Sequence, residues 1–477
     1  MRTWIRGGDV VAWDGREHVV VRDGDLVLDD DRVAFAGTDY AGVADTIVEG
    51  AGRLVCPGFV NLHCEVDLSH GPLWDDLTRP NLYAIRPLEW LWDPQEAPVF
   101  SPDEVRAGAR LSMGTALRCG STTVVGINTL VFKRWDDAVW EPDVFVGVAD
   151  ELGIRAYLSH HFRAGVVAGG PERPEVVWND PAGRRGLERG VAFVERLRRR
   201  QDDRVQGLLF PYTLDTMTPD LLRETAAAAS QVKTRVRMHF AQSRTEVERI
   251  RAWCAQDPVA FLEDLGFLGP HLILTHAMHI ATEDDGDLER LARHGVHIAH
   301  CPVVMRRSGR VLRSFSRYRR AGLNVGLGTD TFPSDIIEEM RWAAIGSKLV
   351  DRHPASGLAR EVFEAATIAG ARALGREDLG RLAVGAKADV TVGDLRRLHI
   401  GPDDDPIKAL VHYAVQEDVE HVYVDGRRVV DGGRVCGMNE QETLVMTQGL
   451  ASKMMDLFAE WSGQRVDELF PPSFPLA

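Results

Sequence analysis

Eight short apolar runs, separated by stretches with a helical pattern, are the feature that most limits how this chain can fold. Strands that alternate with helices predict a parallel sheet covered by helices. Eight such units in about 310 residues match the size of a (β/α)8 barrel. We therefore predict an α/β fold built on a TIM barrel, with a doubly wound sheet as the alternative. The runs lie at 58–65, 121–128, 154–160, 206–212, 235–241, 271–276, 296–301 and 323–329.

The two ends of the chain have another pattern, that of short strands joined by tight turns. Near the N-terminus, Asp14-Gly15 and Asp23-Gly24 predict hairpin turns between alternating runs. Alternating runs return at 388–392 and 421–430. Neither end has enough strands to bury a core alone, so we predict that both ends pair in one small β-sandwich beside the barrel. The predicted domains are 1–57 and 378–437 for the sandwich, 58–377 for the barrel, and 438–477 for a tail with an amphipathic helix.

Charge and cysteine content exclude several classes of function. Asp and Glu number 71 against 56 Lys and Arg, a net charge of −15, so the chain lacks the basic field that attracts nucleic acid or an anionic membrane. The six cysteines include no Cys-x-x-Cys pair, which argues against a disulfide scaffold or a zinc ribbon. No run approaches the roughly 20 apolar residues that a membrane span needs. We expect a cytoplasmic protein whose partner is a small-molecule substrate.

Metal-competent side chains recur where the predicted barrel strands end. His63 and Glu65 are two residues apart at the end of the first strand, so both point to the same face. His239, His276 and Asp330 follow at the ends of the fifth, sixth and eighth runs. Imidazoles and carboxylates are good ligands for divalent metals, and barrel active sites lie at the carboxyl ends of the strands. The pattern therefore predicts a metal site at this end of the barrel.

A linked set of motifs occurs in a fixed order along nearly the whole chain. It comprises LVCPGFVNLH at 54–63, the strands of His239 and His276, AHCP at 299–302, GLGTD at 326–330, ATIAGARALG at 366–375 and GRLAVGAKADV at 380–390. In this set the chain resembles the amidohydrolase superfamily, and within it the branch of triazine hydrolases and of cytosine, guanine and adenosine-type deaminases. In that family the last motif leads the chain back into the sandwich.

The resemblance implies a metal-dependent hydrolase with one divalent ion, which would activate the attacking water. Asp330 would take the proton as general base, and His276 would polarise the substrate or stabilise the developing charge. Family members are commonly dimers or larger, so we expect a homodimer or a larger homo-oligomer with the C-terminal helix as a candidate interface. Carried over residue by residue, the metal ligands are His63, Glu65, His239 and Asp330. Separately, candidates for contact with the substrate or with the ligands are His279, His300, His161 and Trp90.

Two positions depart from the family pattern. The motif on the first strand is His-x-His in the family, and its second histidine is Glu65 here. A carboxylate ligand favours manganese, iron or cobalt over zinc, so the ion is zinc or one of these three. Deaminases of this branch usually carry a glutamate proton shuttle where this chain has Gln242. Glutamine donates and accepts hydrogen bonds but transfers no proton at ordinary pH.

These departures leave three functions open. The first is a hydrolase that attacks a C–N bond of an amide, a urea, a carbamate or a substituted heteroaromatic ring. The second is a deaminase of an aminated heterocycle with another proton shuttle, and the third is an inactive homologue that binds a small molecule. The aromatic insertion at 66–100 predicts a lid over the site, and Arg86 and Arg163 are candidates for contact with a substrate carboxylate.

Overall fold

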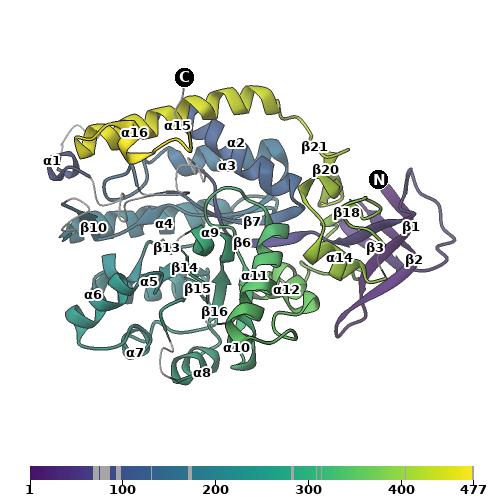
Figure 1. The fold of residues 1–477 in the computed structure, drawn as a ribbon, viewed down its shortest axis with the longest axis horizontal. Coiled ribbons are helices and arrows are strands. Elements are labelled where there is room, and N and C mark those ends of the chain that lie inside the picture. The colour runs from purple at the N-terminus through teal and green to yellow at the C-terminus, as the bar shows by residue number, and fades with distance from the viewer. Residues whose placement is uncertain are drawn as a thin grey trace.

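The computed structural model arranges the chain as a body of parallel strands wrapped by helices, with a larger sheet at one side (Figure 1). The described residues are 1–67, 75, 86–92, 98–129, 131–169, 175–280, 284–307, 309–312, 314–402 and 404–474.

Eight parallel strands form the centre of the molecule, one in each predicted run. They lie in two four-stranded sheets with the orders β12-β8-β7-β6 and β14-β15-β16-β17. Isolated parallel bridges from Leu209 to Val236 and from Cys64 to Asp330 link the edges of the two sheets. Most of their residues are buried on both faces, which explains why the runs read as continuously apolar. Their bounds are β6 (Phe59–Glu65), β7 (Ser121–Ile127), β8 (Arg155–Leu158), β12 (Val205–Gly207), β14 (Val236–Phe240), β15 (Leu272–His276), β16 (His297–His300) and β17 (Asn324–Leu327).

The helices that connect these strands include several that begin at a capping side chain. In α2 (Pro102–Arg118) the Ser101 hydroxyl accepts from the Glu104 N–H at 3.3 Å, and the Glu104 carboxylate accepts from the Ser101 N–H at 2.7 Å. The other helices are α3 (Glu141–Leu152), α4 (Asp180–Arg198), α5 (Pro219–Gln231), α6 (Arg244–Cys254), α7 (Pro258–Asp264), α8 (Gly286–Arg293), α9 (Pro302–Arg307), α10 (Phe315–Arg320), α11 (Ile336–Asp351), α12 (Ala359–Ala366), α13 (Ile368–Leu374) and α14 (Pro406–His412).

Both ends of the chain contribute to one nine-stranded sheet beside this body (Figure 1). The order is β21-β20-β19-β18-β5-β1-β2-β3, and β4 pairs with β1. The two ends meet where β5 lies antiparallel to β18. The strands are β1 (Arg2–Trp13), β2 (His18–Asp29), β3 (Arg32–Gly37), β4 (Thr46–Glu49), β5 (Arg53–Pro57), β18 (Val390–Asp394), β19 (Val419–Val424), β20 (Arg427–Asp431) and β21 (Arg434–Val435).

The turn predicted at Asp23-Gly24 is wrong, because β2 continues through it to Asp29. The pairing of β1 with β2 shifts register around Gly8, opposite Gly24. A Cβ atom on Gly8 would lie 2.9 Å from a methyl carbon of Val55, so glycine is required for the close approach of the strands. Asp23 has a φ of 49°, a value that Asp tolerates better than most residues. The dipeptide therefore forms a bulge within a long strand.

The C-terminal helix α15 (Glu440–Ser462) lies along α2, across the top of Figure 1. Leu450, Met454 and Phe458 of this helix are buried, and α16 (Val466–Leu469) follows. Leu444 and Met446 belong to the apolar side chains of α15, but they are 53% and 38% exposed. The apolar face of α15 is therefore half-covered within one chain. No helix among the described residues is long and apolar enough to cross a bilayer.

Arg155 joins the central strands to the sheet of the chain ends. Its guanidinium is fully buried and makes two hydrogen bonds to the Asp389 carboxylate, at 2.9 and 3.1 Å, and a third to Asp425. An Arg155→Met variant leaves the buried Asp389 carboxylate without its cation, so it is expected to lose about 3 kcal/mol of unfolding free energy. Equilibrium denaturation measures this loss. The exposed ion pair of Arg184 with Glu224 provides the control: Arg184→Met is expected to cost under about 1 kcal/mol, and equal losses would contradict the prediction.

Candidate metal centre

Three buried imidazoles meet at the carboxyl ends of the central strands. They belong to His63 on β6, His239 on β14 and His276 on β15. Their potential ligand atoms all lie within 4.8 Å of one another. The ring centroids are 4.8 Å apart for His63 and His239, and 5.6 Å apart for the stacked rings of His239 and His276. The structure thus brings together three of the residues predicted for the site.

The ring nitrogens of this cluster suit a bound cation. The Nδ1 of His239 donates to the carbonyl oxygen of Tyr212 at 2.8 Å, which leaves Nε2 with its lone pair. Among the described residues, no hydrogen-bond partner reaches the buried Nε2 of His63 or either ring nitrogen of His276. Burial lowers the pKa of His239 to about 4 and the pKa values of His63 and His276 well below the usual range. Neutral imidazoles with buried lone pairs are the form that binds a divalent metal.

Asp330 follows β17 and turns its carboxylate toward two of the imidazoles. Oδ1 lies 3.6 Å from Nε2 of His63, and Oδ2 lies 3.4 Å from Nε2 of His276. The backbone N–H of Asp330 donates to the His63 carbonyl at 2.7 Å. Asp330 and His276 both have left-handed backbones, with φ values of 60° and 75°. Such strained conformations persist where the surrounding structure fixes them, as it does in active sites.

Glu65 lies beside the cluster, at the end of the same strand as His63. Its side chain is buried, and its backbone N–H donates to the carbonyl oxygen of Asp330 at 2.8 Å. The group of atoms within 4.8 Å consists of His63, His239 and His276 alone, as far as the described residues extend. Of the predicted ligand pair on the first strand, His63 belongs to this group and Glu65 does not. The third imidazole of the group is that of His276. Metal ligation by Glu65 stays a prediction.

Arg237 supports the cluster from within the strands and was missed by the sequence analysis. Its guanidinium donates to Nδ1 of His63 at 3.0 Å and to the carbonyl oxygens of Val125 and Gly126 at 3.1 and 2.7 Å. Burial lowers its pKa to about 9, and the Asp330 carboxylate opposes this effect. Arg237 stands two residues before His239, so alternation along β14 places both side chains on one face. The spacing of two residues between Arg237 and His239 could have predicted that Arg237 lies near the site.

Tyr212 is a second residue that the sequence analysis missed. Its ring lies edge-on to His239, with the centroids 4.9 Å apart, and burial raises its pKa to about 12. The Arg163 guanidinium lies 5.5 Å from the centre of the Tyr212 ring and donates to the carbonyl oxygens of Lys133 and Arg134. Arg86 donates to the carbonyl oxygens of Val131 and Val167. Both arginines predicted to contact a substrate therefore bind backbone carbonyls.

Gln242 follows β14 and is held by its backbone. The buried Glu246 carboxylate accepts the N–H groups of Ala241 and Gln242, both at 2.8 Å, and Arg310 donates to the Gln242 carbonyl at 2.8 Å. Burial raises the pKa of Glu246 to about 8. Glu246 also lies where the Ser243 hydroxyl caps α6. This carboxyl group, unremarked in the sequence, fixes the loop that carries Gln242.

The remaining predicted contacts lie in varied surroundings. His161 uses both ring nitrogens, with Asp137 Oδ2 at 3.0 Å from Nδ1 and the Asn128 N–H at 3.2 Å from Nε2. His300 is buried at the end of β16, and burial lowers its pKa to about 3. The His279 N–H donates to the Ala241 carbonyl at 3.0 Å. The ring of Trp90, on α1 (Leu88–Leu91), contacts the ring of Trp461 of α15 at a tilt of 47°, with the centroids 5.0 Å apart, so it faces the C-terminal helix. Most of the predicted lid lies outside the described residues.

Comparison with known proteins identifies the relatives of this chain. The model of the amidohydrolase family matches residues 54–429, which is most of the chain. The chain belongs to the amidohydrolase family. As an amidohydrolase it is a metal-dependent hydrolase, and it acts on non-peptide carbon–nitrogen bonds.

Curated relatives of this amidohydrolase are similar along almost their whole length. A 5-methylthioadenosine/S-adenosylhomocysteine deaminase from Thermococcus kodakarensis is 31% identical over 434 residues, which cover 90% of this chain and 93% of that protein. A 5'-deoxyadenosine deaminase from Methanosarcina mazei is 28% identical over 443 residues, which cover 91% and 94%.

Solved structures agree with the fold of this amidohydrolase. An adenosine deaminase from Xanthomonas campestris with bound zinc has a TM-score of 0.78 and 23% identity, covering 95% of this chain and 98% of that one. Atrazine chlorohydrolase from Arthrobacter aurescens complexed with zinc has a TM-score of 0.80 and 23% identity, covering 94% and 99%. The fold is therefore a TIM barrel of mixed α and β content.

Proposed function

We propose that this amidohydrolase removes an amino group from a small adenosine-type molecule, using one divalent metal. The buried cluster of imidazoles with Asp330 beside it carries the proposal. His63 and His239 would hold the ion, with Asp330 and Glu65 as carboxylate ligands. Zinc is the first choice because a solved neighbour of the same fold contains it. Bound there, the ion would supply an activated water at neutral pH.

The chain's own residues would move the proton and orient the substrate. Asp330 takes the proton that the attacking water loses as the O–C bond forms, and delivers it to the leaving nitrogen as the C–N bond breaks. His276, whose Nε2 lies 3.4 Å from Asp330 Oδ2, would polarise the substrate or stabilise the charge that develops on it. The Gln242 amide hydrogen-bonds the substrate. Tyr212 and Arg237 hold His239 and His63 in place.

We also propose the architecture around this site. The eight strands close into a barrel over 58–377, with the bridges from Leu209 to Val236 and from Cys64 to Asp330 in support. Residues 1–57 and 378–437 would form a β-sandwich, followed by the tail 438–477. A homodimer would cover the exposed Leu444 and Met446 of α15.

Ammonia release tests the proposed activity. Metal-loaded protein is mixed with 5'-methylthioadenosine, S-adenosylhomocysteine and 5'-deoxyadenosine, and ammonia is measured by a coupled assay. Turnover of at least one of them is expected, because the curated relatives are named for these substrates. Absence of ammonia from all three with fully loaded protein would contradict the proposal.

Gln242 favours a second candidate, hydrolysis with a leaving group that needs no proton from this position. Ureas, carbamates and substituted heteroaromatic rings offer such groups. A Gln242→Glu variant separates the two candidates, because a carboxyl group here transfers protons and general acid catalysis contributes at least about 10²-fold. We expect it to raise kcat for ammonia release about 100-fold and to leave urea or carbamate hydrolysis unchanged. Steady-state kinetics measures both, with Gln242→Asn as control. A kcat for ammonia release as low as that of the control would show that no proton is needed here.

A further inference from the structure

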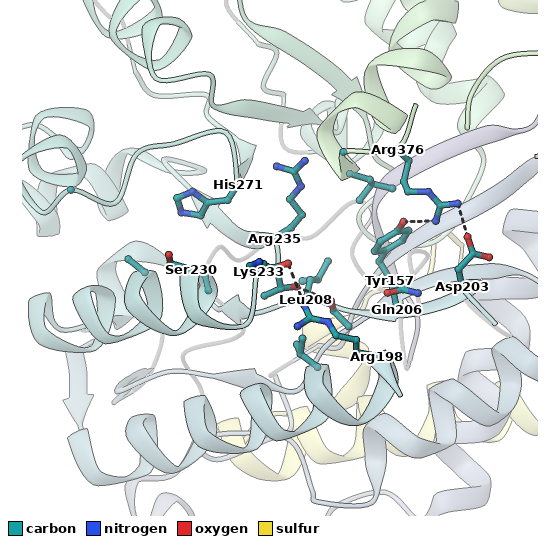
Figure 2. Close-up of a pocket in the computed structure, with 18 residues that line it drawn as sticks. Tyr157, Arg198, Asp203, Gln206, Leu208, Ser230, Lys233, Arg235, His271 and Arg376 are labelled. Carbon is teal, nitrogen blue, oxygen red and sulfur yellow. Dashed lines mark hydrogen bonds and ion pairs between the residues drawn. The ribbon is translucent and has the colours of Figure 1, made fainter. Parts of the chain in front are cut away.

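A large polar cavity lies at the amino ends of the central strands, opposite the end that carries the imidazole cluster. Its volume is about 860 Å³. Its walls come from the beginnings of the central strands. Lys233, Thr234 and Arg235 precede β14, and His271 precedes β15. Figure 2 shows the Arg235 side chain standing between the His271 ring and the Arg376 side chain in this view. The proposed activity uses none of these residues.

The cavity is positively charged although the chain as a whole carries −15. Arg198, Lys233, Arg235 and Arg376 line it, and Asp203 is the one acidic residue among its lining residues. Arg376 is neutralised, because it forms ion pairs with Asp203 at 2.8 Å and Asp378 at 2.7 Å.

The other cations of the cavity have no carboxylate within ion-pair distance in the described part of the chain. Arg198 donates to the carbonyl oxygens of Val232 and Lys233, and Arg235 donates to that of Pro270. Carbonyl groups satisfy some N–H groups of a guanidinium but leave its charge unbalanced. Lys233, which is exposed, makes no ion pair among the described residues.

The Arg235 guanidinium lies beside Gly375 at the wall of the cavity. Burial lowers its pKa, and its Nη2 atom lies 2.1 Å from where a Cβ atom on Gly375 would stand. Any side chain at 375 would therefore displace the guanidinium. A planar guanidinium can bind two phosphate oxygens through parallel N–H groups.

Neutral donors complete the lining. The Tyr157 hydroxyl accepts from Arg376 at 3.3 Å, so its own proton remains for an acceptor in the cavity. The Nε2 of His271 is buried without a hydrogen-bond partner among the described residues, and burial lowers the His271 pKa, which keeps the ring neutral. Leu208 and Leu374 supply an apolar portion.

We propose that this cavity is a binding site for a small organic phosphate. The dianionic phosphate would lie between Lys233, Arg235 and His271, and the organic part would extend toward Tyr157 and Leu208. The volume is that of a site for a small-molecule ligand rather than for phosphate alone. Arg235 is separated from His239 by the length of β14, roughly 13 Å at about 3.3 Å per residue, so the two sites are distinct.

Isothermal titration calorimetry on the full-length, metal-loaded protein at low salt tests the proposal. The probe is ribose 5-phosphate, with ribose as its uncharged counterpart. We expect binding of one ribose 5-phosphate per chain and no binding of ribose. Arg235→Gln and Lys233→Gln should each raise the Kd at least about 10-fold, because each removes a charge that faces the phosphate. Arg199→Gln is the matched control, since Arg199 is exposed at the end of α4 and does not line the cavity.

Turnover of the variants and binding after chelation of the metal are measured as well. Turnover at the metal centre should be unchanged in Arg235→Gln and Lys233→Gln, which shows that both variants are folded. Lys233 is exposed, so its variant remains informative if Arg235→Gln is unstable. The proposal is overturned if ribose 5-phosphate does not bind, if Arg199→Gln weakens binding as much as the cavity variants do, or if chelation of the metal abolishes binding.

Discussion

An Asp330→Asn variant is expected to lose about 10³-fold of kcat with little change in fold. The carboxylate lies within 3.6 Å of two imidazoles and is the proposed carrier of the proton from water to the leaving nitrogen. General acid–base catalysis of this kind contributes about 10²- to 10⁴-fold. Steady-state kinetics at saturating substrate measures the loss.

Asparagine is the suitable replacement at this position for a backbone reason. Asp330 has a φ of 60°, and asparagine tolerates the left-handed region whereas alanine is strained there. Asp330→Ala should be equally inactive but less stable. A variant with unchanged metal content and more than about a tenth of the original kcat would contradict the role of general base.

Loss of the metal is the second large effect. A His239→Ala variant should purify with well under one equivalent of metal and with no measurable turnover, because His239 is positioned by the Tyr212 carbonyl to present Nε2. Elemental analysis of the purified protein measures the metal. Adding metal at 100 times its Kd to chelated wild-type protein should raise the unfolding free energy by about 2.7 kcal/mol. A full equivalent of metal in His239→Ala would contradict the assignment.

The same measurement decides between Glu65 and His276. If Glu65 ligates the ion as proposed, Glu65→Gln lowers metal content and His276→Asn retains it. The reverse outcome would assign the third position to His276, whose ring nitrogens belong to the imidazole group. The variants are comparable, because each replaces the candidate ligand group with a neutral amide.

The central strands were predictable because their signal is local and strong. Most residues of these strands are buried, so the runs read as largely apolar. The end of each strand then locates the side chains that face the predicted site, which is why the sequence alone could predict that His63, His239, His276 and Asp330 lie close together. The turn at Asp23-Gly24 was mispredicted because the deciding contact, between Gly8 and Val55, comes from another strand.

The supporting residues of the site were harder to predict because their roles depend on partners far away in the chain. Arg237 donates hydrogen bonds to carbonyl groups on β7 and to the ring of His63. No local sequence pattern predicts either contact. Tyr212 acts through its backbone carbonyl, which any residue possesses. Trp90 was predicted near the substrate because it lies in the aromatic insertion, and its ring contact with Trp461 depends on where the last helix lies.

The sheet shared by the two chain ends determines when the N-terminal strands can finish folding. β5 leaves the ribosome early, whereas its neighbour β18 is made only after the whole barrel region. Until then, the edge of β5 exposes unpaired backbone N–H and C=O groups, which can template association with another chain. Folding of the N-terminal strands is therefore completed after translation has passed Val390, and the nascent chain depends on protection of that edge until then.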